Sequence, residues 1–222
     1  MADFNYIDTG KVDYKVCWDH QEKLLEEVIS DKLAKKMPSS KNFFLLVEHP
    51  HVYTLGKSGD THNMLIPDEF LRKIDASFYR INRGGDITYH GPGQLVGYPI
   101  IDLDYYHMGV REYIERMEDA IVDTLMEYGL QAGRRGGATG VWLDASHRVR
   151  ARKICAMGVR VSRSVTMHGF ALNVNTDLRY FNYINPCGFD SSSVTSMQQE
   201  LGKPLDMNEI KALVREKFNQ KY

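Results

Sequence analysis

Apolar and polar residues alternate along this chain with two different periods, which predict helices and strands in turn. Over residues 18–36 the apolar positions lie three or four apart, with Glu, Asp and Lys between them, and this spacing predicts an amphipathic helix. Residues 110–128 repeat that spacing. A third helix is predicted to begin at Asp206, because Glu209 follows three residues later as in a capping box.

Short apolar runs rich in β-branched residues predict strands between these helices. The predicted strands are 43–47, 52–56, 94–103, 140–143, 152–161 and 165–174. The polar turn between 140–143 and 152–161 predicts that these two form a hairpin. Hairpins interleaved with helices favour a single α/β domain over residues 1–222, with a mixed, largely antiparallel sheet and flanking helices.

Composition narrows the class of protein. The chain has 222 residues, 43% hydrophobic and 26% charged, with a formal net charge of -1. This balance fits one globular domain and gives no overall attraction to nucleic acid or to an anionic membrane. No run approaches the roughly 18 apolar residues of a membrane span. No heptad or long apolar stripe is present, so we expect a monomer.

Cysteine usage and the first residues bear on the compartment and on metals. The three cysteines form no CxxC pair, which argues against a disulfide framework and fits a reducing compartment. The start carries Asp3 and Asp8 and no apolar run, unlike a signal peptide. The histidines and cysteines show no metal-ligand spacing, so no metal is expected. We therefore expect a cytoplasmic protein.

The densest candidate for chemistry is the stretch RGGDITYHGPGQ, residues 83–94. Gly84 and Gly85 allow the backbone to approach a ligand closely, and Arg83 adds a planar cationic group. His90 stands where a strand-like segment meets a rigid Gly-Pro-Gly loop, which is a common place for site residues. The competing interpretation is a tight turn with a surface arginine and a structural histidine.

A second candidate is INPCGF, residues 184–189, where proline and glycine flank Cys187 and present its thiol on a turn. A lone cysteine is more often a small buried apolar residue. As a nucleophile it needs a nearby cation or base, because a free thiol has a pKa of about 8.5. The segment 145–176 carries six Lys or Arg residues and no Asp or Glu, which predicts a local basic face or a guarded strand edge.

A third glycine-rich stretch, GRRGGATG at 133–140, lacks the spacing and the lysine-serine ending of a phosphate-binding loop. We interpret it as a flexible surface turn.

Four segments taken in order resemble the octanoyltransferase, or lipoyl(octanoyl) transferase, family. They are RGGDITYHGPGQLVGYP, KICAMGVRV, TMHGFALNV and INPCGF, and the resemblance extends from about residue 48 to 197. It implies a fold similar to the catalytic domain of biotin and lipoate protein ligases. It also implies transfer of an octanoyl or lipoyl group from acyl carrier protein to a lysine of lipoyl domains, as the first step of endogenous lipoate synthesis.

The resemblance assigns roles to particular residues. Cys187 becomes the nucleophile that forms an acyl-thioester, and Lys153 lowers the pKa of its thiol. The implied substrate-binding residues are Arg83, Gly84, Gly85, Asp86, Ile87, Thr88, Tyr89, His90, Ala156, Met157, Gly158, Gly169, Phe170 and Ala171. Asp86 is expected to point away from the thiolate. Strand alternation would place Cys155 on the face of Lys153, which leaves open which thiol is acylated.

The implied partners are octanoyl-acyl carrier protein as donor, and as acceptors the lipoyl domains of 2-oxoacid dehydrogenase E2 subunits and the glycine cleavage H protein. No cofactor is implied, since conversion of a thioester to an amide runs downhill without ATP. Three alternatives stay open at this point. They are an ATP-dependent lipoate or biotin ligase, a thiol hydrolase using Cys187 with His90 or His168, and a non-catalytic module that binds acyl groups or their carrier.

Overall fold

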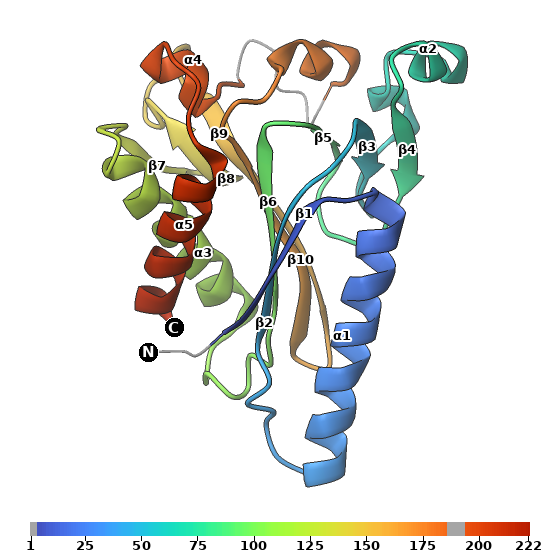
Figure 1. The fold of residues 1–222 in the computed structure, drawn as a ribbon, viewed down its shortest axis with the longest axis vertical. Coiled ribbons are helices and arrows are strands. Elements are labelled where there is room, and N and C mark those ends of the chain that lie inside the picture. The colour runs from blue at the N-terminus through green and yellow to red at the C-terminus, as the bar shows by residue number, and fades with distance from the viewer. Residues whose placement is uncertain (1–3, 186–193) are drawn as a thin grey trace.

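The computed structural model describes residues 4–185 and 194–222, and in these residues the chain forms one α/β domain around a seven-stranded sheet (Figure 1). The strand order is β1-β2-β6-β10-β9-β8-β7. The strands are β1 (Asn5–Lys11), β2 (Phe43–Glu48), β6 (Gln94–Ile100), β7 (Ala132–Arg135), β8 (Ala138–Leu143), β9 (Arg152–Ser162) and β10 (Val165–Asn173). The edge strand β1 runs parallel to β2 and all other neighbours are antiparallel, so the predicted mixed, largely antiparallel sheet is confirmed.

A smaller sheet stands beside the large one and was not predicted. It has the order β4-β3-β5, with β3 at Val52–Leu55, β4 at Ser77–Arg80 and β5 at Ile87–His90. The short helices η1 (Thr61–Asn63) and α2 (Asp68–Lys73) lie between β3 and β4, and η2 (Leu178–Tyr183), from much later in the chain, packs against the same small sheet through Phe181. Since β5 leads into β6 through a Gly-Pro-Gly turn, the stretch 83–94 joins the two sheets.

Helices cover both faces of the large sheet. In Figure 1, α1 (Tyr14–Lys35) lies against one face, while α3 (Val110–Met126) and α5 (Met207–Lys221) lie together on the other. The inner faces are apolar: Leu25 and Val28 of α1 pack with Val96, and Met117 and Ile121 of α3 belong to the main core. A short helix, α4 (Met197–Leu201), precedes α5.

The predicted helices all form, and the largest boundary shift is at the start of α1. α1 begins four residues before its predicted start, because the Asp13 carboxylate accepts hydrogen bonds from the backbone of Lys15 and Val16. Its first turn buries Tyr14, which is 2% exposed. α5 begins as predicted, since the Asp206 carboxylate accepts from the Asn208 backbone N–H at 2.7 Å. Among the described residues, no helix is both long enough and apolar enough to cross a membrane.

Candidate active site

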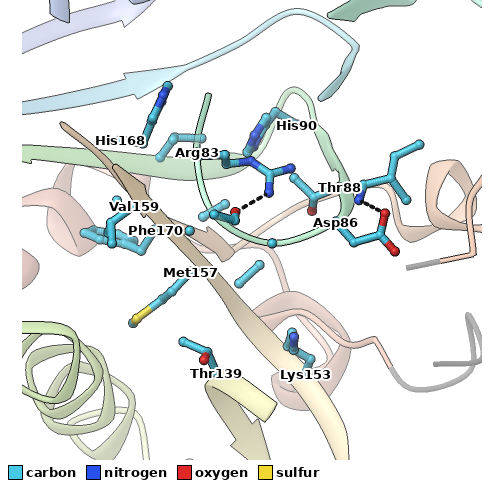
Figure 2. Close-up of a pocket in the computed structure, with 18 of the residues that line it drawn as sticks. Arg83, Asp86, Thr88, His90, Thr139, Lys153, Met157, Val159, His168 and Phe170 are labelled. Carbon is cyan, nitrogen blue, oxygen red and sulfur yellow. Dashed lines mark hydrogen bonds between the residues drawn. The ribbon is translucent and has the colours of Figure 1, made fainter. Parts of the chain in front are cut away.

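A cavity of about 410 Å³ lies between the loop 83–87, the hairpin β9–β10 and the tip of the hairpin β7–β8. Figure 2 shows Lys153 and Thr139 toward one end of it, and His90 and His168 toward the other, with Arg83 between. Three stretches far apart in the sequence therefore meet around one space. The loop and the two strands of the β9–β10 hairpin carry motifs that resemble a transferase family, whereas the tip of the β7–β8 hairpin was interpreted as a surface turn.

The loop 83–85 lies directly on β9. The backbone N–H of Gly84 donates to the carbonyl of Val159 at 2.9 Å. A Cβ atom at Gly158 would stand 2.9 Å from the carbonyl oxygen of Gly84, so the close approach requires glycine there. Gly85 has φ +87°, a conformation that a side chain would strain. These glycines let bare backbone form one wall of the cavity.

Arg83 lines the cavity, but hydrogen bonds to the protein hold its guanidinium. Nη2 donates to the carbonyl and to the hydroxyl of Thr54 at 2.7 and 3.0 Å, and Nη1 donates to the carbonyl of Gly84 at 3.0 Å. The residue is 7% exposed. Arg83 thus ties β3 of the small sheet to the glycine loop and fixes the loop's position.

The remaining residues of this motif divide between the two faces of β5. Thr88 and His90 face the cavity, whereas Ile87 and Tyr89 belong to the hydrophobic cluster of the small sheet, and Ile87 also touches the cavity. The Tyr89 hydroxyl is hydrogen-bonded to His51 Nδ1 at 2.7 Å, and its ring stacks on Tyr180. Tyr89 therefore does not line the described cavity, because strand alternation turns its side chain into the core of the small sheet.

Asp86 turns toward the backbone around it. One carboxylate oxygen accepts from the N–H of Ile87 at 2.7 Å, and the other accepts from Asn63 Nδ2 at 2.6 Å. Figure 2 shows the carboxylate directed to the side of the loop opposite Arg83. Asp86 also belongs to the cavity wall.

His90 is a buried and neutral histidine. Its Nδ1 lies 2.8 Å from Gln94 Oε1, and since an amide oxygen only accepts, Nδ1 carries the proton. Gln94 in turn donates to Asn173 Oδ1 at 2.9 Å. Burial lowers the pKa of His90 to about 3, with neighbouring His49 as the next cause, and burial likewise lowers the pKa of His168 to about 3.

The two other implied substrate-binding segments face each other across β9 and β10. The antiparallel register pairs Gly158 with Gly169, Met157 with Phe170 and Ala156 with Ala171. All six residues line the cavity. A single strand pair therefore explains why these two motifs occur together in the sequence.

Lys153 also lines the cavity, at the start of β9. Its Nζ stands 4.8 Å from the centre of the Trp142 ring, a cation–π arrangement. Its carbonyl accepts from the N–H of Thr195 at 2.9 Å, and Lys153 forms a parallel bridge with Val194. Cys187 lies outside the described residues, while the chain that follows its segment returns beside Lys153.

Cys155 does not share the face of Lys153. Opposite β8, Lys153 pairs with Trp142 and Cys155 with Val141, and the register shifts between them. This bulge places two positions of β9 that are two apart against adjacent positions of β8, and thus on opposite faces. Cys155 is fully buried in the main core, and burial raises the pKa of its thiol well above the usual value. The alternation argument was therefore wrong.

The predicted basic face is not one surface. Arg152 forms ion pairs with Asp144 and Glu200, and Arg160 forms one with Glu22. Their partners come from outside the acid-free segment, so the sequence pattern could not reveal them. Arg163 follows the far end of β9, roughly 30 Å along the strand from Lys153. Arg148 and Arg150 remain exposed, and they flank Val149, which is 85% exposed.

The stretch 133–140 is a β-hairpin as well as a surface turn. Arg134 pairs with Val141 across β7 and β8, and the tip residues Gly136 and Gly137 are exposed. Gly137, Ala138 and Thr139 line the cavity mouth, which the interpretation as a flexible surface turn missed.

Several lining residues carried no signal that sequence reasoning used. Gln94 and Asn173 stand inside quoted motifs and could have been chosen as polar residues next to glycine turns. Tyr14, Tyr98 and Trp142 come from elements that read only as core-forming. Among the described residues, no group of three or more His, Cys, Asp or Glu side chains is placed to hold a metal ion.

Comparison with known proteins gives concordant results. Residues 13–219 match the family model of the lipoyl protein ligase A/B catalytic domain. An octanoyltransferase of Christiangramia forsetii is 52% identical over 216 residues, which cover 95% of this chain and 92% of the relative. An octanoyltransferase of Parabacteroides distasonis is 50% identical over 218 residues, which cover 98% of each chain.

Solved structures show the same fold at low sequence identity. The bi-partite lipoate protein ligase of Thermoplasma acidophilum superimposes with a TM-score of 0.73 at 16% identity, covering 100% of this chain and 84% of that one. Lipoate-protein ligase A bound with ATP gives a TM-score of 0.69 at 15% identity, covering 99% and 85%. Biotin protein ligase of Aquifex aeolicus gives 0.53 at 12%, covering 100% and 69%.

Proposed function

This chain belongs to the lipoyl protein ligase A/B catalytic domain family and transfers octanoyl groups in lipoate biosynthesis, and from this premise we propose how its cavity performs the transfer. Cys187 takes the octanoyl group from acyl carrier protein as a thioester and passes it to a lysine of a lipoyl domain. Lys153 is the partner of the thiol. The acceptors are lipoyl domains of 2-oxoacid dehydrogenase E2 subunits and the glycine cleavage H protein, and the enzyme acts as a cytoplasmic monomer.

The observation that supports this assignment is the return of the chain to Lys153. The segment after Cys187 is hydrogen-bonded to the backbone of Lys153 through Thr195, and Lys153 lines the same cavity as the glycine loop. A cation beside a thiol favours the thiolate, and each unit by which it lowers the pKa is worth about 1.4 kcal/mol.

The proton balance needs no further reactant. The Cys187 thiolate attacks the carrier thioester, a carbon–sulfur bond forms, and the carrier thiol leaves with a proton from the Lys153 ammonium. Neutral Lys153 then takes a proton from the ammonium of the incoming lysine. The freed amine attacks the enzyme thioester, the Cys187 thiolate leaves, and the amide nitrogen releases its second proton to solvent. Backbone N–H groups of the glycine-rich wall are suited to stabilise the oxyanion at each attack.

Two rival mechanisms are less well supported. A thiol hydrolase needs a histidine base with a pKa near neutral, but the pKa values of His90 and His168 are both lowered to about 3 by burial. An ATP-dependent ligase shares the fold, whereas the relatives at about half identity are octanoyltransferases.

Intact mass after incubation with octanoyl-acyl carrier protein, without ATP, tests the proposal. We expect an octanoyl adduct on the wild type that is lost in Cys187→Ser, retained in Cys155→Ser and discharged by apo lipoyl domain. An unmodified wild type, with lipoyl-domain acylation only when free octanoate and ATP are supplied, would reject the thioester route. Full acylation of the lipoyl domain by the Cys187→Ser variant would reject the role of Cys187.

A further inference from the structure

The chain that enters the Cys187 segment is held by a short stretch between β3 and α2. Residues Met64 and Ile184 form an antiparallel bridge, and the N–H of Leu65 donates to the carbonyl of Tyr183 at 3.0 Å. The N–H of Asn185 donates to the carbonyl of Asn63 at 2.8 Å. Asn185 stands two residues before Cys187, a span of at most about 7 Å of extended chain, so its position limits where the thiol can lie.

Asn63 is held in turn by Asp86 of the glycine-rich loop. Asn63 Nδ2 donates to Asp86 Oδ2 at 2.6 Å, a hydrogen bond to a charged acceptor and therefore one of the stronger kind. Asn63 ends the short helical turn η1, whose other two residues, Thr61 and His62, are exposed. The carboxylate supplies a contact from the cavity wall itself.

Asp86 connects the wall of the cavity to Asn63. It is 9% exposed, its second oxygen accepts from the N–H of Ile87, and its carbonyl accepts from Gly56 at 3.3 Å. It directly follows Gly84 and Gly85, which lie on β9 and form the cavity wall. A continuous set of contacts thus runs from the wall of the cavity through Asp86 and Asn63 to Asn185.

The other flank of the segment is held by different elements. Thr195 donates its N–H to the carbonyl of Lys153, and its own carbonyl accepts from Asn173 Nδ2 at 3.0 Å. The chain that leaves the Cys187 segment is therefore held at Lys153, and the chain that enters it is held, through Asn63, at the glycine-rich loop. Lys153 and the loop both line the cavity that would hold the acyl group.

We infer that Asp86 and Asn63 act as positioning residues that set the entry of the Cys187 segment relative to the glycine-rich wall of the cavity. This inference rests on the proposed role of Cys187. It also gives the carboxylate of the RGGD motif a purpose: Asp86 acts on the nucleophile's chain through Asn63. Displacement of a reacting group by about 1 Å can cost about 100-fold in rate.

A reciprocal exchange tests the pair. In Asp86→Asn the acceptor for Asn63 becomes an amide, and in Asn63→Asp two carboxylates face each other. We expect each single variant to lower the single-turnover rate of octanoyl-enzyme formation by about 10- to 100-fold, without a matching rise in KM for the octanoyl carrier. In the double variant the new amide at 86 can accept from Ile87 and donate to the carboxylate at 63, so most of the rate should return.

Asp102→Asn is the matched control. Asp102 is also a buried carboxylate that accepts a backbone N–H, from Ser39 at 2.8 Å, but it lies at the opposite end of β6. We expect it to lower the melting temperature at least as much as the single variants and to leave the rate of acylation within about threefold of wild type.

The outcomes separate this inference from the proposed function. If Cys187→Ser keeps full activity, the thioester route fails. If Cys187→Ser is inactive while the two single variants acylate as fast as Asp102→Asn, the positioning role is overturned. A double variant as slow as the slower single variant would equally overturn it, since the pair would then not act through this hydrogen bond.

Discussion

At the scale of single residues, the cavity combines one lysine with imidazoles that burial keeps neutral. Lys153 stands over the Trp142 ring, while His90 and His168 have pKa values lowered to about 3. An uncharged histidine cannot supply the cation that a thiolate needs. In the proposed mechanism, the cation that activates the thiol is therefore Lys153.

Replacing Lys153 by Met keeps most of the length of the side chain and removes its charge. We expect the pH profile of Cys187 alkylation by iodoacetamide, followed by peptide mass, to move up toward a pKa of about 8.5, with about a tenfold loss of rate at neutral pH for each unit. Cys17 and Cys155 are 2% and 0% exposed and should react slowly. Exposed Lys203→Met is the control. An unchanged profile in Lys153→Met would contradict the role of Lys153.

At the scale of elements, the site depends on how closely a loop can approach a strand. The loop 83–85 lies on β9 at Gly158 and Val159, and β9 is paired in register with β10. Each of these contacts removes space for a side chain. Glycine at position 158 is therefore required by the packing of two elements and not by a local turn.

Gly158→Ala should push the loop off the strand. The new Cβ would lie 2.9 Å from the carbonyl oxygen of Gly84 and 3.1 Å from Arg83 Cδ. We expect a loss of about 1 to 3 kcal/mol in the free energy of unfolding and about a tenfold fall in kcat/KM. Gly136→Ala, where no atom stands within 4 Å, should change neither quantity. Equal effects of the two substitutions in urea unfolding and steady-state assays would refute the packing argument.

At the scale of the whole molecule, buried histidines couple folding to pH. Burial lowers the pKa of His49 to about 4 and those of His90 and His168 to about 3. In the unfolded chain these groups have a pKa of about 6.5. Between these values the unfolded state binds more protons, so the free energy of unfolding falls as the pH drops from about 6.5 toward 4.

Each buried histidine should contribute a slope of up to about 1.4 kcal/mol per pH unit in that window. Urea unfolding at several pH values measures the total. His168→Gln should reduce the slope by about one histidine's share, whereas His62→Gln should not, because the side chain of His62 is 93% exposed. A free energy of unfolding that stays flat from about pH 6.5 to 4.5 would show that these groups are not neutral in the folded protein.

Docking of the proposed carrier protein would also depend on the surface of the whole molecule. Arg148 and Arg150 are exposed beside Val149, close in sequence to Lys153. Arg148→Glu/Arg150→Glu should raise KM for octanoyl carrier protein about tenfold at low salt and less at high salt, and leave a small octanoyl thioester unaffected. Arg163→Glu, at the other end of β9, is the control. Equal losses with both substrates would argue against docking there.

Sequence patterns alone determined the elements and the motifs of this protein. The spacing of apolar residues predicted α1, α3, α5 and the central strands, since periodicity follows directly from which face of an element is buried. The ordered motifs indicated the family, and all of the implied site residues that the structure describes, except Tyr89, line the cavity. These are local properties of the chain, so they can be identified without knowing which distant segments contact one another.

Tertiary structure decided the rest, because it depends on contacts between distant segments. A bulge against β8, not strand alternation, sends Cys155 into the core and Lys153 into the cavity. Arg152 and Arg160 are neutralised by acids from other elements, and Asp86 reaches the Cys187 segment through Asn63. Such pairings are set by register and packing over the whole domain, so no window of sequence contains them.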